Sequence, residues 1–120
     1  MWGYIALLVI VPIWDYNYSV RIIAKKQLIN FWRIHPDAEQ QLKAWHDEVV
    51  HASWKKPQDI KNQYRNASFI AGNRVVFNIK GNTYRLVVAV AYSFGAVYVK
   101  FIGSHAAYDR IDACTVQLEE

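Results

Sequence analysis

The apolar residues of this 120-residue chain change their spacing once, and this change constrains the fold more than any single motif. Over residues 25–50 they recur every three or four positions, which predicts amphipathic helices. Over residues 74–79 and 84–90 they alternate with other residues, which predicts strands with one buried face. The predicted core residues are Leu28, Phe31, Trp32, Ala38, Leu42, Trp45 and Val49 in the helices, and Val75, Phe77, Ile79, Tyr84, Leu86, Val88 and Val90 in the strands.

Turn-forming residues divide this pattern into separate elements. The β-prone run 20–24 precedes a predicted helix over 25–34, which ends at His35-Pro36 because the residue before proline avoids the helical region. Pro36 also suits the first turn of the next helix, and residues 58–64 are expected to form one short helical turn. Gly81-Asn82 predicts a hairpin, and a turn at residues 93–95 leads to a third strand over 96–102. The sequence therefore predicts an α+β domain in which two N-terminal helices pack on a small antiparallel β-sheet.

Residues 1–19 differ from the rest, and we expect them to be an N-terminal extension to a domain spanning 20–120. The apolar run from Trp2 to Trp14 is shorter than the roughly 20 residues of a membrane-spanning helix, and it lacks the flanks of a secretory signal. It could add a strand or helix to the core, anchor the chain weakly to a membrane, or result from translation upstream of the natural start. The third interpretation is favoured because Val20 is a residue that alternative bacterial start codons encode.

Charge is distributed unevenly along this chain of net charge +4. No acidic residue occurs between Asp59 and Asp109, so one face of the predicted sheet should be electropositive and attract a polyanion such as nucleic acid. The alternative is a solubilising surface whose acids are supplied by the helices. Cys114 is the only cysteine, which excludes an internal disulfide and fits a reducing, cytoplasmic compartment. The basic residues of the acid-free stretch are Lys61, Arg65, Arg74, Lys80, Arg85 and Lys100.

No familiar signature of a metal- or cofactor-dependent enzyme is present. The sequence has no phosphate-binding glycine loop and no zinc-protease helix motif, and His46 and His51 are spaced for different faces of a helix. We therefore expect neither a metal nor a cofactor. RNA can be cleaved without either, because its 2′-hydroxyl is an internal nucleophile that needs only a base, an acid and cations. Arg85, Lys100 and His105 could supply these groups, although each could equally be a solvated surface or capping residue.

Two spaced patterns in the second half of the chain are unusually specific. They are His105-x-x-Tyr108-Asp109 and Asn78-x-x-Gly81-Asn82-x-x-Arg85. Together with Trp54-Lys-Lys-Pro57 and the run 74–79, they resemble the HigB-type toxins of toxin–antitoxin systems. The resemblance extends from about residue 20 to about residue 115, and residues 1–19 have no counterpart in it.

The resemblance implies a RelE-like fold and an endoribonuclease that cleaves mRNA, typically on the translating ribosome. It also implies neutralisation by a HigA-type antitoxin, so that the chain would exist as a monomer or as a toxin–antitoxin hetero-oligomer, with no membrane partner. Carried onto matching positions, it makes Arg85 and His105 the expected catalytic residues, with Tyr108 shaping the site and Lys100 at an expected basic position. The residues expected to bind the RNA backbone are Arg74, Lys80, Lys55 and Lys56.

Two alternatives belong to other functional classes. A RelE-like toxin could inhibit another target without cleaving RNA, as gyrase-poisoning relatives do. A plain RNA- or ribosome-binding module could use the basic sheet only to hold phosphates. The presence of His105 together with Arg85 argues against the first alternative, because gyrase-poisoning relatives tend to lack a catalytic set.

Overall fold

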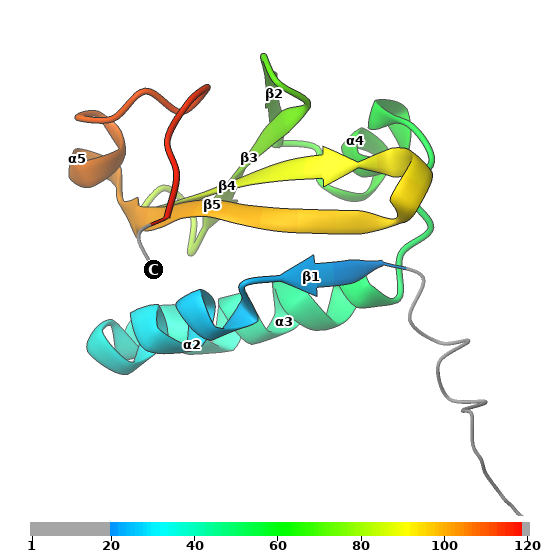
Figure 1. The fold of residues 1–120 in the computed structure, drawn as a ribbon. Helices are drawn as coiled ribbons and strands as arrows, with labels where there is room; N and C mark the ends of the chain where they lie inside the picture. Colours follow the sequence, from blue (N-terminus) through cyan, green and yellow to red (C-terminus); the bar gives the residue numbers. More distant parts are fainter. Residues whose placement is uncertain (1–19, 119–120) are drawn as a thin grey trace, which may run out of the picture.

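The computed structural model describes residues 20–118, which form a five-stranded sheet with helices on one face and at both ends (Figure 1). The prediction that residues 1–19 form an extension lies outside the described residues. The predicted α+β class is confirmed. The elements in chain order are β1 (Arg21–Ile23), α2 (Lys25–Ile34), η2 (Pro36–Ala38), α3 (Glu39–Val50), α4 (Pro57–Gln63), β2 (Ser68–Ile70), β3 (Arg74–Ile79), β4 (Tyr84–Ala91), η3 (Tyr92–Phe94), β5 (Ala96–Ser104) and α5 (His105–Tyr108).

The order of strands across the sheet is β1-β5-β4-β3-β2. The pairs β2–β3, β3–β4 and β4–β5 are antiparallel, and the β3–β4 hairpin turns at the predicted Gly81-Asn82. The prediction of a wholly antiparallel sheet is wrong, because β1 pairs in parallel with the start of β5, with Arg21 opposite Ala96. Apolar alternation fixes which face of a strand is buried, but the neighbour of a three-residue edge strand depends on the helical connection that follows it.

The main hydrophobic core lies between the sheet and the layer formed by α2 and α3 (Figure 1). Every strand residue predicted for the core is buried, because the alternating positions of β3 and β4 face the helices. Phe77 is the centre of an aromatic cluster, with its ring centroid 5.5 Å from that of Trp45 and 6.2 Å from that of Trp54. Phe31 and Trp32 are only partly buried and border this core rather than fill it.

The opposite face of the sheet, here called the outer face, is partly covered by the chain that follows α5. Val76 and Val87 are paired across β3 and β4 on this face and are only 4% and 0% exposed. The segment 109–118 passes across β5 in Figure 1, and Leu118 reaches the main core. This segment, here called the C-terminal tail, separates the end of the outer face near α5 from the end near η3.

A β-bulge interrupts the pairing of β4 with β5. Val87 lies opposite Phe101 whereas Val88 lies opposite Val99, so Lys100 is the extra residue. Such a bulge redirects side chains locally and increases the twist of the strand. It therefore leaves Lys100 and Phe101 together on the outer face, while Val99 remains in the core.

Candidate active site

Arg85 is held near the start of β4, on the outer face of the sheet. Its neighbours Tyr84 and Leu86 face the helices and are buried, so the alternation of the strand directs Arg85 outward. It lies between Asn78 of β3 and Gly103 of β5 in the register of the sheet. Its Nη1 donates a hydrogen bond of 3.2 Å to the carbonyl oxygen of Asn82, within the hairpin turn. Its remaining N–H groups have no carboxylate partner among residues 20–118.

The ring of Tyr108 contacts the guanidinium of Arg85. The Cζ atom of Arg85 lies 5.9 Å from the ring centroid, within the range of a cation–π interaction. Tyr108 is also 6.3 Å from the ring of Phe101, measured between centroids. The sheet comes close to the Phe101 ring because residue 103 is glycine: a Cβ atom there would lie 2.6 Å from Cζ of Phe101. Gly103 therefore makes room for the Phe101 ring, which lies against Tyr108.

His105 is the first residue of α5 and lies at the end of β5. Ser104 caps this short helix, since its Oγ accepts a hydrogen bond of 3.1 Å from the N–H of Ala107. The N–H of His105 itself donates to the carbonyl oxygen of Thr83 at 3.1 Å. The hairpin turn that binds Arg85 through Asn82 thus also fixes the backbone of His105. The turn between β3 and β4 therefore binds both predicted catalytic residues, although they are 20 positions apart in the sequence.

The imidazole of His105 is exposed to solvent and faces a carboxylate. Its side chain is 49% exposed, and Nε2 lies 3.5 Å from Oδ1 of Asp109 one helical turn later. A half-exposed imidazole can exchange protons with solvent and with a bound substrate, as an acid or base must. Sequence reasoning gave no role to Asp109, although its spacing of four from His105 on a helix was a usable signal.

Lys100 lies farther along β5, with the C-terminal tail beside it. Its Nζ donates a hydrogen bond of 3.0 Å to Oε1 of Gln117 and lies 5.8 Å from the ring centroid of Tyr98. It is three residues from Gly103, or about 10 Å along the strand. Lys100 therefore shares the outer face with Arg85, but the structure does not bring it into the contact between Arg85 and Tyr108.

Arg74 does not lie where an RNA backbone could easily reach it. The residue is 6% exposed, and its Nη1 donates to the carbonyl oxygens of Ala113 at 2.9 Å and Val116 at 2.8 Å. This guanidinium therefore fixes the C-terminal tail on the outer face. The alternation of β3 placed Arg74 on that face correctly, but it contained no information on what covers the face.

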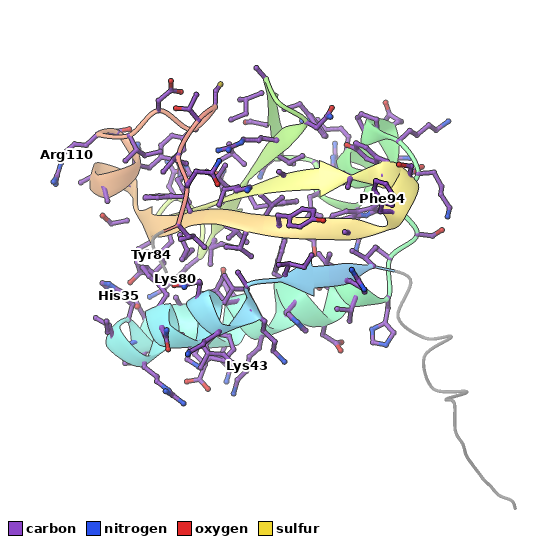
Figure 2. All side chains as sticks on the ribbon, in the orientation of Figure 1. His35, Lys43, Lys80, Tyr84, Phe94 and Arg110 are labelled. Atoms are coloured by element: carbon purple, nitrogen blue, oxygen red, sulfur yellow. The ribbon has the colours of Figure 1, made fainter. Side chains whose placement is uncertain are left out.

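Lys80 points toward the helices and pairs with an acid. Its Nζ lies 3.1 Å from Oδ2 of Asp37, and the hydroxyl of Tyr84 donates to Oδ1 of the same carboxylate at 2.6 Å. Lys80 and Tyr84 lie near His35, between the sheet and the helices, in Figure 2. The hydrogen bond from Tyr84 and then the charge-assisted bond from Lys80 lower the pKa of Asp37. Lys80 therefore anchors the hairpin turn to the corner between α2 and α3.

Lys55 and Lys56 are far from the Arg85 region. Both are exposed just before α4, where their backbone N–H groups donate to Oδ2 of Asp59 at 2.8 and 3.2 Å. Figure 1 shows α4 and α5 at opposite ends of the sheet. The two lysines thus do not join the other predicted site residues, and any contact they make with RNA is a separate one.

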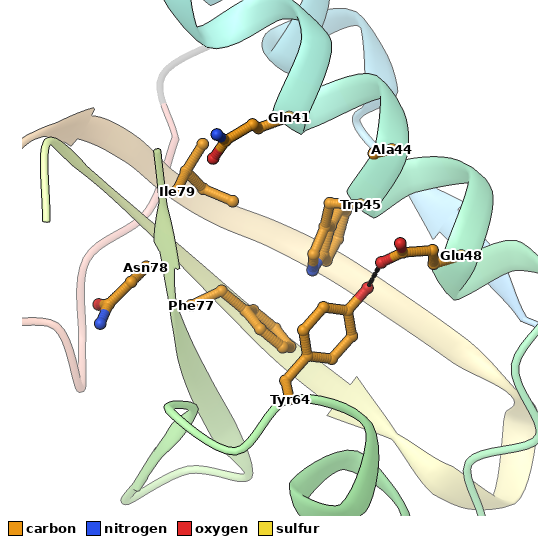
Figure 3. Close-up of a pocket in the computed structure, with 8 residues that line it drawn as sticks. All are labelled: Gln41, Ala44, Trp45, Glu48, Tyr64, Phe77, Asn78 and Ile79. Atoms are coloured by element: carbon orange, nitrogen blue, oxygen red, sulfur yellow. Dashed lines mark hydrogen bonds between the residues drawn. The ribbon is translucent and has the colours of Figure 1, made fainter. Parts of the chain in front are cut away.

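A small aromatic cavity lies between α3 and the end of β3, and none of the four predicted catalytic residues lines it. Its volume is about 200 Å³, and Trp45, Tyr64 and Phe77 form its walls (Figure 3). The hydroxyl of Tyr64 donates to Glu48 at 2.5 Å, and burial together with this bond raises the pKa of Tyr64. Nε1 of Trp45 is inaccessible to solvent and has no hydrogen-bond partner in the described part of the chain, residues 20–118. The cavity belongs to the core rather than to the Arg85 region.

Among residues 20–118, no three His, Cys, Asp or Glu side chains gather as a metal site would require. Over the same residues, no helix is both long enough and apolar enough to cross a bilayer.

The arrangement that emerges is a guanidinium on an aromatic ring, with an exposed imidazole on the same short helix as that ring. The family model of the HigB toxin, described as the RelE-like toxic component of a toxin–antitoxin system, matches residues 38–111. The chain belongs to the HigB toxin family. The match includes Arg85, Lys100, His105 and Tyr108. A search of curated proteins gave no match.

Membership of the HigB family identifies the chain as a toxin component and implies an antitoxin as its partner. The mixed sheet and its helices are consistent with a RelE-like toxin. The matched region begins at Ala38 and so leaves out β1 and α2, which contribute to the core but not to the Arg85 region.

Proposed function

We propose that this HigB-family toxin is an endoribonuclease that cleaves mRNA, on the translating ribosome, in the cytoplasm. The observation that carries the proposal is the contact of Arg85 with Tyr108 at 5.9 Å, with the exposed imidazole of His105 on the same short helix as Tyr108. Inhibition ends when a HigA-type antitoxin binds the toxin, which is otherwise a monomer. Family membership supports the toxin class, and the chemistry of the side chains supports the reaction.

The reaction needs a base, an acid and hydrogen-bond donors to the phosphate oxygens. The 2′-oxygen of the RNA attacks the adjacent phosphorus, the bond from phosphorus to the 5′-oxygen breaks, and a 2′,3′-cyclic phosphate and a free 5′-hydroxyl result. A base removes the proton of the 2′-hydroxyl and an acid delivers one to the leaving 5′-oxygen. His105 takes one of these two parts, because its imidazole is 49% exposed and can both accept and donate a proton.

Arg85 stabilises the negative charge that grows on the phosphate oxygens during attack. Its guanidinium has free N–H donors and is held in place by Asn82 and by the ring of Tyr108. Preorganised donors of this kind avoid the cost of reorienting solvent in the transition state. Tyr108 shapes the site by fixing that guanidinium, and Lys100 contributes positive charge on the same face. Lys55 and Lys56 contact the RNA backbone away from the cleaved bond, whereas the ammonium of Lys80 is already paired with Asp37.

The test is a cell-free translation reaction analysed by primer extension along the mRNA. The parent protein is expected to produce discrete breaks, and Arg85→Ala and His105→Ala are each expected to lower the cleavage rate by about 10²–10³. Arg110→Ala is the matched control, because Arg110 is an exposed cation that projects from the same end of the molecule (Figure 2). Inhibition of translation without breaks would identify a non-cleaving toxin or binding module instead, and changes in DNA topoisomers would identify a gyrase poison.

A further inference from the structure

Phe94 is the most exposed large apolar side chain of residues 20–118, at 82%. It is the last residue of η3 and projects at the turn between β4 and β5 (Figure 2). The turn between β2 and β3 faces it, with Gly72 and Asn73 in left-handed conformations at φ 81° and 58°. These two turns border a groove of about 520 Å³, which is within the size range of ligand pockets.

The walls of this groove, here called the Phe94 groove, are aromatic. Tyr92, Phe94 and Tyr98 line it, and Nζ of Lys100 lies 5.8 Å from the Tyr98 ring. Asn73 is also among its lining residues, and within residues 20–118 no carboxylate lines the groove. This combination of accessible rings with positive charge and without acids is typical of surfaces that bind unpaired nucleic-acid bases.

One carboxylate, that of Asp59, acts electrostatically on a residue of the groove. Asp59 lies close enough to Tyr92 to raise the pKa of that phenol, after the larger effect of burial. However, Oδ2 of Asp59 accepts the backbone N–H groups of both Lys55 and Lys56 at the start of α4. The carboxylate is thus committed to capping a helix, and it does not line the groove.

The Phe94 groove opens on the same face of the sheet as Arg85. Ala89 lines the groove and lies four residues along β4 from Arg85, a distance of about 13 Å. Tyr98 is paired with Ala89 across β4 and β5. The C-terminal tail lies between the two places, bound to Arg74 and Lys100. A single strand with its scissile phosphate at Arg85 would cross over the tail to place a nucleotide in the groove, about 13 Å along the strand.

We propose that the Phe94 groove binds an unpaired base of the RNA, flanking the bond that is cleaved at Arg85. This inference rests on the proposed endoribonuclease function and adds a second contact to it. The base stacks on the ring of Phe94, and Asn73 hydrogen-bonds to its edge. The contact is sequence-tolerant, because every base has a face that can stack on an aromatic ring.

The experiment measures binding of a fluorescently labelled 2′-O-methyl oligoribonucleotide to the full chain. This probe cannot be cleaved, since its 2′-oxygen is blocked. Phe94→Leu keeps an apolar side chain but removes the ring, and it is expected to weaken binding about fivefold or more. Phe94→Trp is expected to bind at least as tightly as the parent. Ile34→Ala is the matched control, because Ile34 is 76% exposed at the end of α2, and it should leave affinity unchanged.

A second readout uses 2-aminopurine in the same oligonucleotide, whose fluorescence is quenched when the base stacks. Quenching by the parent and by Phe94→Trp, but not by Phe94→Leu, would support stacking on Phe94. Equal affinity and equal quenching for the parent and Phe94→Leu would overturn the inference, whereas cleavage by the parent would leave the proposed function intact. Conversely, ring-dependent binding without any cleavage would support the groove and contradict the endoribonuclease. Loss of antitoxin binding in Phe94→Leu with unchanged RNA affinity would overturn the inference in favour of a protein contact.

Discussion

Replacement of Arg74 by methionine should detach the C-terminal tail from the sheet. The buried guanidinium donates two hydrogen bonds, to the carbonyl oxygens of Ala113 and Val116. A hydrogen bond to a charged group contributes about 1.5–3 kcal/mol, so two such bonds set an upper limit of about 3–6 kcal/mol. Methionine keeps most of the volume but donates no hydrogen bond.

The expected loss is smaller than this limit, because the two carbonyl groups regain water when the tail lifts. We expect Arg74→Met to lower the free energy of unfolding by about 2–4 kcal/mol. Urea denaturation of parent and variant measures this difference. Hydrogen exchange at Val116 should accelerate more than exchange within β4, since the tail opens before the sheet does.

Arg110→Met provides the control, since Arg110 is an exposed arginine whose loss should change stability by no more than about 0.5 kcal/mol. If Arg74→Met were as stable as Arg110→Met, and the exchange of Val116 were unchanged, the assignment of Arg74 to the tail would be refuted. Arg74 would then again be a candidate for binding RNA.

Two further predictions concern the ends of the first strand and helix. Hydrogen bonds from Tyr84 and Lys80 lower the pKa of Asp37 below its ordinary value of 3.8. The ionised Asp37 carboxylate therefore stabilises the fold above pH 3.8, and this stabilisation is lost as the pH falls through the lowered pKa. Acid titration should therefore show Asp37→Asn less stable than the parent at neutral pH, with a gap that closes below pH 3.8; a gap independent of pH would contradict this. Residues 20–120 with an initiating Met should keep the toxicity and melting temperature of the full chain, because Val20 is buried and its N–H already bonds to Val50; a lower melting temperature would assign residues 1–19 to the fold.

The sequence predicted the elements of the fold best where burial alone decides them. Leu86 and Val88 face the core because alternation and a single buried face leave no other register. The strand β2 was missed because it has three residues and its central Phe69 is 41% exposed, so it has no apolar alternation to detect. The parallel pairing of β1 was missed for a related reason, since a short strand does not encode its neighbour.

The sequence identified residues of the candidate site, but it did not predict how the fold brings them together. Arg85 and Tyr108 meet because β4 and β5 place Arg85 opposite Gly103 and because Ser104 then starts α5. The strand pattern predicted an antiparallel sheet but not this register, and the turn into α5 depends on a single capping hydroxyl. Phe101 was not predicted at the site, because only the bulge at Lys100 brings its ring to the outer face.

Arg74 and Lys100 are both cations on the outer face, but they differ in how they contact the C-terminal tail. Arg74 donates to two backbone carbonyls and is 6% exposed, so a phosphate could reach it only after the tail had left. Lys100 donates to the neutral side-chain amide of Gln117 at 3.0 Å, near the end of the tail. A phosphate oxygen accepts a hydrogen bond from an ammonium more strongly than a neutral amide does. RNA can therefore take Lys100 from Gln117 while Arg74 still holds the tail, and so Lys100 belongs to the proposed RNA-binding face whereas Arg74 belongs to the fold.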